Sequence, residues 1–172
     1  MSALFAGSAF EVHEVSSQED ITLVRALVVA HGDARRTTPG VEYVYADAAN
    51  MPGPYVPPNG GIWIALAGNV GAGCVALRDM GSQVGEIKRM FVAAGFRGQG
   101  VGRALLVALI AGARARGYQT LRLGTLDDML AARQLYASVG FIPIERYRHD
   151  ELIDTRFHEL ALTSAVDKVR LS

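Results

Sequence analysis

Residues 85–117 read GEIKRMFVAAGFRGQGVGRALLVALIAGARARG, and they contain the clearest structural signals in the chain. Residues 84–92 are rich in apolar side chains and predict a strand. Residues 100–116 carry an apolar stripe at helical spacing, and Gly117 is typical of a helix C-terminus. Between the two lies Gly98-Gln99-Gly100-Val101-Gly102. The stretch therefore predicts a strand, a glycine-rich turn and a helix.

The turn before the predicted helix suits a diphosphate. The first N–H groups of a helix have no partner within it, and they point where the helix dipole favours negative charge. Glycine lets a ligand approach the backbone closely, and Arg97 and Arg103 add positive charge beside the turn. A glycine-rich turn that only begins a helix has the same pattern, so spacing alone leaves both interpretations open.

Two common phosphate-binding motifs do not fit this turn. A Rossmann fingerprint that begins at Gly98 requires a small residue where Arg103 stands, and it belongs near the start of its domain. A P-loop requires Gly-Lys-Ser/Thr, and the sequence has no lysine beside the turn. The pattern therefore indicates a diphosphate site of another kind.

The rest of the chain predicts a sheet with helices. Ser16 and Ser17 precede apolar residues at helical spacing and predict a helix start, followed by a polar connection over residues 31–40. The other predicted helices are Val41–Asn50, Gly100–Arg116 and Met129–Val139. The predicted strands are Phe10–Val15, Ile62–Ala67, Cys74–Arg78, Val84–Val92, Thr120–Leu123, Phe141–Tyr147 and Thr155–Leu162. This order predicts an α/β (α+β) fold, a mixed sheet with helices on both faces.

Composition narrows the class of protein. The 172 residues are enough for one domain, predicted to span 1–172, and 17 basic residues balance 17 acidic ones. That balance favours neither nucleic acid nor an anionic membrane as the partner. Cys74 is the only cysteine, which favours a reducing, cytoplasmic location, and the four histidines lack metal-ligand spacing. No metal site and no transmembrane segment are expected.

Two blocks of the sequence resemble the GNAT superfamily of N-acetyltransferases. The first is Arg97-Gly98-Gln99-Gly100-Val101-Gly102, which matches the family's acyl-CoA motif Arg/Gln-x-x-Gly-x-Gly/Ala. The second is the run from Ala132 to Phe141, which reads ARQLYASVGF and matches Ala-x-x-Leu/Phe-Tyr-x-x-x-Gly-Phe. The resemblance implies a mostly antiparallel GNAT sheet, acetyl-CoA as co-substrate and an amine acceptor. The run from Gly124 to Met129 resembles a bacterial branch of the family, and Met129 stands where many members have an asparagine that contacts pantetheine.

The resemblance also implies where the acyl donor binds. Backbone groups of Met90, Phe91 and Val92 would pair with pantetheine like an added strand, and the N–H of Met90 would stabilise the oxyanion. The pyrophosphate would lie on the turn formed by Arg97, Gly98, Gln99, Gly100, Val101, Gly102 and Arg103.

Tyr136 and Glu86 are the candidate catalytic residues. A phenol can protonate a leaving thiolate, so Tyr136 is the predicted general acid, although its helix pattern also fits a core tyrosine. Glu86 is the predicted general base that takes a proton from the amine, although a glutamate paired with Lys88 or Arg89 fits equally well. Alternation places Glu86 on one strand face with Lys88, Met90 and Val92.

The acceptor is predicted only by class. The resemblance places its pocket near Tyr55 and residues 149–155, and Asp33, Asp47 and Asp150 are candidates to bind a cationic acceptor. We expect an enzyme that acetylates a primary amine of a small molecule or peptide by direct attack in a ternary complex. A non-catalytic acyl-CoA sensor is the alternative. Pairing of two copies is a further implication of the resemblance.

Overall fold

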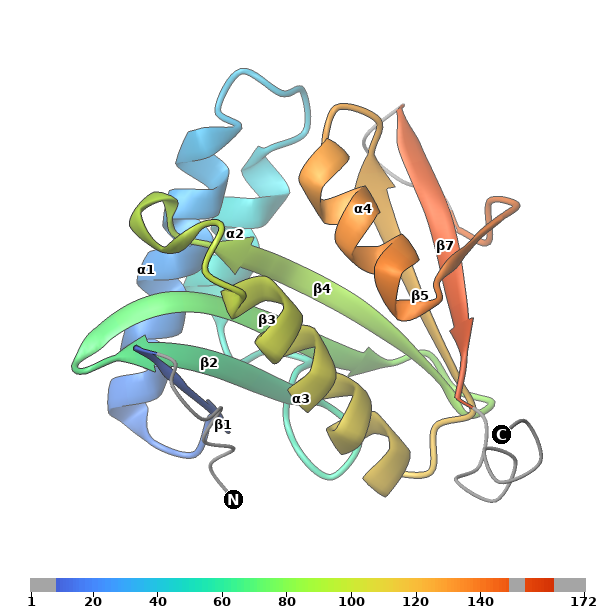
Figure 1. Cartoon of the computed structure of the whole chain (residues 1–172), viewed down its shortest axis with the longest axis horizontal. Coiled ribbons are helices and arrows are strands. Elements are labelled where there is room, and N and C mark those ends of the chain that lie inside the picture. The colour runs from blue at the N-terminus through green and yellow to red at the C-terminus, as the bar shows by residue number, and fades with distance from the viewer. Residues whose placement is uncertain (1–8, 149–153, 163–172) are drawn as a thin grey trace.

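The computed structural model describes residues 9–148 and 154–162, and it contains one seven-stranded sheet with four α-helices (Figure 1). The strands stand in the order β1-β2-β3-β4-β5-β7-β6, and all neighbours are antiparallel except the parallel pair β4 and β5. The strands are β1 (Glu11–Glu14), β2 (Gly61–Ala67), β3 (Val70–Asp79), β4 (Val84–Val92), β5 (Thr120–Leu126), β6 (Ile142–Ile144) and β7 (Thr155–Ala161). The helices are α1 (Gln18–Ala34), α2 (Glu42–Asn50), α3 (Val101–Ala115) and α4 (Leu130–Val139), and a 3₁₀ turn spans Ala94–Phe96.

Helices cover both faces of the sheet, as predicted. On one face, α3 and α4 pack on a core that contains Leu105, Leu109 and Leu121. On the other face, α1 and α2 pack on a second core that includes Val28 and Ile64. Figure 1 shows α3 lying across β2 and β3, while α1 and α2 lie on the far side. The predicted mixed, mostly antiparallel sheet with helices on both faces is confirmed.

Local signals placed most elements correctly. Ser17 accepts a hydrogen bond from the Asp20 N–H over 3.0 Å, so it is the N-cap of α1 that the sequence predicted. However, α1 continues through His31 to Ala34, into the predicted polar connection. The His31 ring stacks on Phe91 with 5.2 Å between centroids, so a tertiary contact favours the extra turn.

Three strands differ by more than one residue from their predicted bounds at one end or the other. β3 begins at Val70 rather than Cys74, so the hairpin turn is only two residues long. β5 continues three residues beyond the predicted end, to Leu126. β6 is only Ile142–Ile144, much shorter than predicted. It lies at the sheet edge, and its Pro143 has no N–H for a ladder hydrogen bond.

A bulge interrupts β4. The register with β3 shifts between Lys88 and Phe91, so that Arg89 and Met90 together stand opposite a single β3 residue. Arg89 has φ of +54°, a left-handed conformation at this extra residue. The bulge reverses the alternation of side chains along the strand.

The prediction that Glu86 shares a strand face with Met90 and Val92 is therefore wrong. Met90 and Val92 pack with the core beneath α3, as Ile87 does. Lys88, on the same side as Glu86, instead approaches the Tyr43 ring of α2. The extra residue in the bulge places Met90 and Val92 on the opposite face of the sheet from Glu86. Alternation along a single strand does not reveal a bulge.

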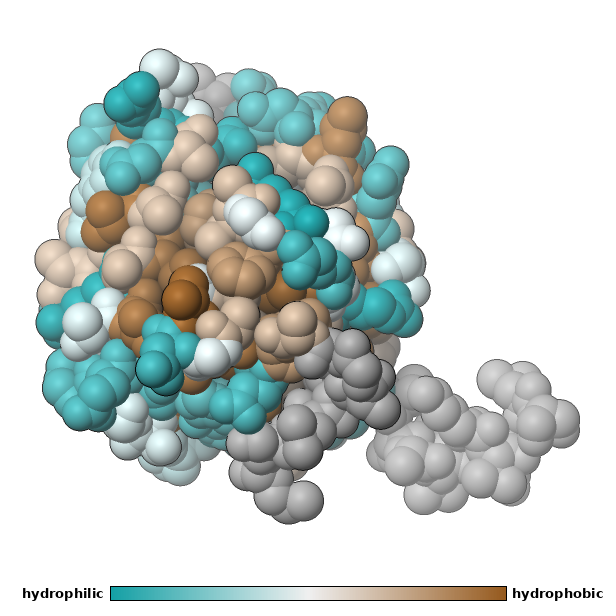
Figure 2. All heavy atoms as spheres, turned by 60° about the vertical axis from the view of Figure 1, so that its left-hand side comes forward, coloured by the Kyte–Doolittle hydropathy of each residue, from teal (hydrophilic) through white to brown (hydrophobic). Residues whose placement is uncertain are grey.

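Figure 2 shows one face of the molecule, on which apolar residues gather near the middle and hydrophilic residues surround them. Apolar surface of this kind is common on soluble proteins. Within residues 9–148 and 154–162, none of the helices is both long and apolar enough to cross a bilayer.

Candidate active site

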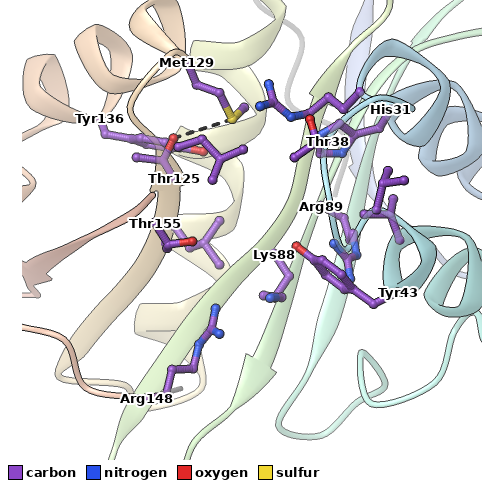
Figure 3. Close-up of a pocket in the computed structure, with 16 residues that line it drawn as sticks. His31, Thr38, Tyr43, Lys88, Arg89, Thr125, Met129, Tyr136, Arg148 and Thr155 are labelled. Atoms are coloured by element: carbon purple, nitrogen blue, oxygen red, sulfur yellow. Dashed lines mark hydrogen bonds between the residues drawn. The ribbon is translucent and has the colours of Figure 1, made fainter. Parts of the chain in front are cut away.

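The site begins where two strands of the sheet separate. Pairing between β4 and β5 ends at Ile87 and Leu123, but β4 continues to Val92 and β5 to Leu126. Figure 1 shows the two strands diverging beyond this point. A pocket lies between them, with α4 on one side and the α1–α2 region on the other (Figure 3). The divergence thus creates a cavity within the sheet itself.

The diverging part of β4 has one unpaired edge. Phe91 and Val92 pair with β3, but among the described strands none pairs with the opposite edge of β4 beyond Ile87. That edge presents backbone N–H and C=O groups that an extended ligand can pair with, like an added strand. Met90, Phe91 and Val92, the residues predicted to bind pantetheine, lie along this segment.

The glycine-rich turn follows this edge after the 3₁₀ turn Ala94–Phe96. Gly98 and Gly100 have φ of +74° and +83°, and a Cβ at either position would meet nothing within 4 Å. The first hydrogen bond of α3 runs from the Ala104 N–H to the Gly100 carbonyl over 3.0 Å. The N–H groups of Val101, Gly102 and Arg103 precede it and have no partner within the helix. The turn therefore has the open backbone that a diphosphate requires.

Side chains around the turn bring positive charge and close packing. Arg97 donates from Nε to the Val92 carbonyl over 3.1 Å, and Arg103 donates to the Ser138 hydroxyl of α4 over 3.2 Å. A Cβ on Gly102 would lie 3.3 Å from the Met90 methyl group, so this glycine lets α3 approach β4 closely. These contacts hold both guanidinium groups beside the turn.

Tyr136 lies on the α4 side of the pocket. It is buried, and its ring makes an edge-to-face contact with Phe141, with 5.7 Å between centroids. Burial raises the pKa of the Tyr136 phenol well above its usual value, so the phenol stays protonated at neutral pH. Figure 3 shows Tyr136 beside Thr125, across the pocket from Lys88. Tyr136 thus both packs in the core and lines the cavity.

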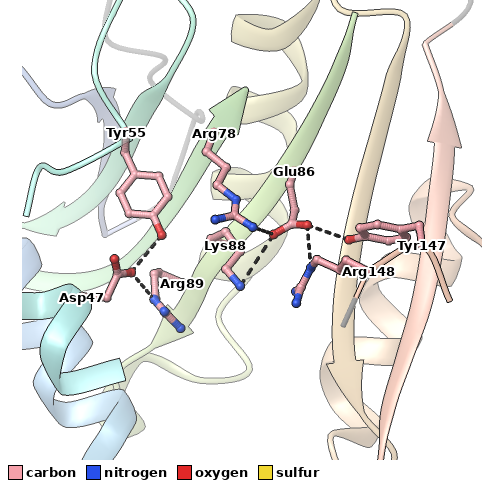
Figure 4. A network of polar contacts seen from close by, with 8 residues as sticks. All are labelled: Asp47, Tyr55, Arg78, Glu86, Lys88, Arg89, Tyr147 and Arg148. Carbon is pink, nitrogen blue, oxygen red and sulfur yellow. Dashed lines mark hydrogen bonds and ion pairs between the residues drawn. The ribbon is translucent and has the colours of Figure 1, made fainter. Parts of the chain in front are cut away.

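Glu86 is fully buried and belongs to a charge cluster (Figure 4). Its Oε1 accepts a hydrogen bond from Arg78 over 2.9 Å and lies 3.6 Å from the Lys88 Nζ. Its Oε2 accepts hydrogen bonds from the Tyr147 hydroxyl and the Arg148 Nε, each over 2.9 Å. Burial opposes ionisation, but the neighbouring cations and the Tyr147 hydroxyl hold the pKa of Glu86 below its usual value. A carboxylate in this setting is a weak proton acceptor, so its role as general base stays a prediction.

A second ion pair adjoins this cluster. The Arg89 Nε lies 2.5 Å from Asp47 Oδ2, which also accepts a hydrogen bond from the Tyr55 hydroxyl over 2.8 Å. Asp47 therefore neutralises Arg89 in this structure, so it is not an unpaired carboxylate that could bind a cationic acceptor. Asp33 accepts a hydrogen bond from Tyr45, and Asp150 lies outside the described residues.

A family model described as the acetyltransferase (GNAT) family matches residues 28–141, well over half of the chain. The chain belongs to the GNAT family.

Sequence relatives agree with this assignment. The chain is 40% identical over 81 residues to the uncharacterised N-acetyltransferase YsnE of Bacillus subtilis, which covers 46% of this chain and 54% of that protein. It is 33% identical over 119 residues to the uncharacterised N-acetyltransferase C1271.07c of Schizosaccharomyces pombe, which covers 68% of this chain and 73% of that protein. It is 37% identical over 101 residues to human N-acetylaspartate synthetase, which covers 57% of this chain and 33% of that protein. The chain thus spans about half of YsnE and a third of the human relative.

Solved structures share the fold. A GNAT acetyltransferase from Staphylococcus aureus Mu50 superposes with a TM-score of 0.78 at 20% identity, covering 90% of this chain and 99% of that one. A protein from Bacillus anthracis, solved with acetyl coenzyme A, has a TM-score of 0.54 at 25% identity. The match covers 62% of this chain and 65% of that one. The GNAT fold of this chain is therefore shared almost end to end with the staphylococcal protein.

Met129 marks a departure from the GNAT pattern within the pocket. Its sulfur accepts a hydrogen bond from the Thr125 hydroxyl over 3.7 Å, and both residues line the cavity (Figure 3). A thioether is a weak acceptor and no donor, unlike the asparagine amide of many GNAT members. Any pantetheine contact at this position must therefore be largely apolar.

No pattern in the sequence pointed to two residues of the Glu86 cluster. Tyr147 and Arg148 fall in what was predicted as strand and connection, but the chain leaves β6 after Ile144 and carries both side chains to Glu86. They lie 61 and 62 residues from Glu86 in the sequence. The spacing of residues within one motif cannot predict a contact between residues so far apart in the chain. Of the predicted acceptor region, residues 149–153 lie outside the described part of the chain.

Proposed function

We propose that this GNAT protein is an N-acetyltransferase that works as a single domain and moves an acetyl group from acetyl-CoA to a primary amine. The observation that carries the proposal is the continuity of three features. The unpaired edge of β4 leads to the open turn before α3 at one end, and it borders the pocket between β4 and β5. An extended thioester with a diphosphate fits a site of that shape.

The residues present fit acetyl-CoA. Met90, Phe91 and Val92 lie on the unpaired edge, where backbone groups are available to pantetheine. Residues 97–103 supply the open backbone and two guanidinium groups for the pyrophosphate. The Bacillus anthracis structure with acetyl coenzyme A supports the same choice of donor.

The proposed chemistry is direct attack in a ternary complex. The neutral amine nitrogen attacks the thioester carbonyl, a C–N bond forms, the C–S bond breaks, and the thiolate leaves. Tyr136 is the proposed general acid that protonates this thiolate, because its phenol lines the pocket and stays protonated at neutral pH. The Met90 N–H is the proposed donor to the oxyanion.

We retain Glu86 as the candidate for proton removal, but only through a relay. Both of its oxygens already accept hydrogen bonds from Arg78, Tyr147 or Arg148, and the side chain is fully buried. Because the side chain is fully buried, direct contact with an acceptor amine would require these neighbours to move. A water between the amine and the cluster would allow the proton to leave without that cost.

The acceptor is a small molecule or a peptide with a free amine. Several relatives are named N-acetylaspartate synthetase, among them the human protein at 37% identity over 101 residues. An amino acid is therefore a reasonable first acceptor to test. Neither nucleic acid nor a membrane is proposed as a partner.

We also propose a cytoplasmic location and pairing of two copies in solution. Cys74, the single cysteine, is a buried free thiol, which suits a reducing compartment. Light scattering coupled to gel filtration measures the mass directly. A mass of one chain, 18.4 kDa, would rule out the pair.

The first test is calorimetric titration of the purified protein with acetyl-CoA, NADH and ATP, followed by an acetyl-transfer assay with a panel of amines. Binding of acetyl-CoA alone, with CoA released in proportion to amine acetylated, is the expected result. Binding without turnover of any amine would favour the alternative, an acyl-CoA sensor. No binding of acetyl-CoA by the folded protein would contradict both.

A further inference from the structure

Two cavities meet over β4. The pocket between β4 and β5 contains Tyr136, and a second, outer cavity lies between β3, β4 and α2. The two share Tyr43, Lys88, Arg89 and Arg148. A molecule that enters through the outer cavity would therefore pass these side chains before it reaches the proposed site of acetyl transfer.

The lining of the inner pocket is strongly biased in charge. It contains the cationic side chains of Arg35, Lys88, Arg89 and Arg148, and no carboxylate among the residues that the structure describes. A cavity with low-dielectric walls and one sign of charge concentrates ligands of the opposite charge. It also opposes the entry of a polyamine or another cationic acceptor.

The acidic partners of these cations are already engaged. Asp128 pairs with Arg35, and Asp47, which lines the outer cavity, pairs with Arg89. Glu86 is shared by Arg78, Lys88 and Arg148, so one buried carboxylate faces three cations. Asp47 neutralises Arg89, and its Oδ2 also accepts a hydrogen bond from the Tyr55 hydroxyl. Within this group the described cations, Arg78, Lys88, Arg89 and Arg148, outnumber the described carboxylates, Glu86 and Asp47, so the described part of the junction is net positive (Figure 4).

Lys88 has donors available for a ligand. Its Nζ lies 3.6 Å from Glu86 Oε1 and 5.8 Å from the Tyr43 ring centroid, and it makes no hydrogen bond within the described residues. An ammonium group has three donors. Arg89 uses its Nε for Asp47, so the two terminal nitrogens of its guanidinium group are not needed for that bond. Figure 3 shows both side chains on the wall opposite Tyr136.

We propose that the acceptor is an amine that also carries a carboxylate, and that Lys88 and Arg89 bind this carboxylate. The inference rests on the proposed acetyltransferase function and adds the class of its acceptor. Glu86 and Asp47 act as positioning residues, because they hold the two cations at the junction of the cavities. The carboxylate binds against the β4 wall, and the amine is then available to the pocket that Tyr136 lines.

The test uses acceptors that differ only at the carboxylate. The acetyl-transfer assay compares each of a panel of L-amino acids with its amide and with the amine that lacks the group. The wild type is expected to show a kcat/KM at least tenfold higher for the carboxylate form, chiefly through a lower KM, since a charge-assisted contact is lost in the others.

Variants connect this preference to the residues. Lys88→Gln is expected to reduce the ratio of kcat/KM between an amino acid and its amide by about tenfold. Lys88→Glu is expected to reverse the preference towards the amide and the amine. Arg114→Gln removes one positive charge from an exposed position on α3, outside both cavities, and is the control expected to retain the wild-type ratio. A thermal melt of each variant separates a binding defect from unfolding.

Two outcomes separate this inference from the proposed function. If amides and amines are acetylated as well as amino acids, or if Lys88→Gln weakens all three equally, the carboxylate inference is overturned while the acetyltransferase function stands. If the protein transfers acetyl groups to none of them, the proposed function fails and the inference fails with it.

Discussion

The Lys88 Nζ lies 3.6 Å from Oε1 of Glu86, two residues earlier on the same strand. Burial lowers the pKa of Lys88 to about 8, and the Glu86 charge opposes that shift. Lys88 is therefore still mainly charged at neutral pH, because a buried anion lies beside it. The same anion holds Arg78 and Arg148, so a single carboxylate organises the cationic wall of the site.

Glu86→Gln is expected to destabilise the protein by about 3 kcal/mol, because it leaves cations near a buried site without their anion. Urea denaturation at pH 7 measures the change. The pH profile of kcat separates the two roles of the residue. Loss of an acidic limb with unchanged stability would indicate a direct base and contradict the positioning role proposed for Glu86.

Gly100→Ala is expected to weaken acetyl-CoA binding at least tenfold and to lower stability by about 1 kcal/mol. A Cβ there meets no neighbour, so the cost arises from φ of +83° and not from a clash. Calorimetry and a thermal melt measure the two effects. Gly68→Ala is the matched control, since Gly68 also has positive φ and open space but lies in the β2–β3 turn. Equal acetyl-CoA affinity in both variants would argue against the turn as the diphosphate site.

Tyr136→Phe is expected to lower kcat about a hundredfold with little loss of stability. The ring contact with Phe141 survives the change, and only the hydroxyl group is removed. Tyr118→Phe removes the hydroxyl of another buried tyrosine, which donates to the Asn59 carbonyl outside the pocket, and serves as control. A stopped-flow measurement of CoA release gives kcat for each. Equal rates for wild type and Tyr136→Phe would remove the proposed acid.

His31 is expected to make stability depend on pH. Burial, then the charges of Arg89, Arg35 and Arg97, lower its pKa from 6.5 to about 4. The unfolded chain therefore binds a proton between pH 6.5 and 4 that the folded chain excludes, so stability is complete above pH 6.5 and falls as the pH decreases towards 4. The loss assigned to this residue is about 2 kcal/mol after allowance for partial exposure.

The comparison for His31 is the variant His31→Gln, which cannot take up the proton. Its free energy of unfolding, measured by urea titration from pH 7 to pH 4, should decrease less than that of the wild type. Parallel curves for the two proteins would contradict the shift in pKa.

The sequence determined the local parts of this protein. The Ser17 cap, the glycine turn and the start of α3 depend on backbone conformation within a few residues, and each was predicted where the structure has it. The two GNAT blocks were likewise read from contiguous residues, and they identified the family. Residues adjacent in the chain interact at no loop-closure cost, so local patterns predict such features well.

The arrangement of the site depends on contacts between residues that are far apart in the sequence. The bulge at Arg89 depends on the register with β3, and it separated Glu86 from Met90, which strict alternation had placed together. The Glu86 cluster depends on Tyr147 and Arg148, more than sixty residues further along the chain. Contacts of this kind arise from how strands pair and where an edge strand ends. Whether Glu86 acts as a base or as an anchor for cations is thus a question of its neighbours in space, since its neighbours in sequence allowed both.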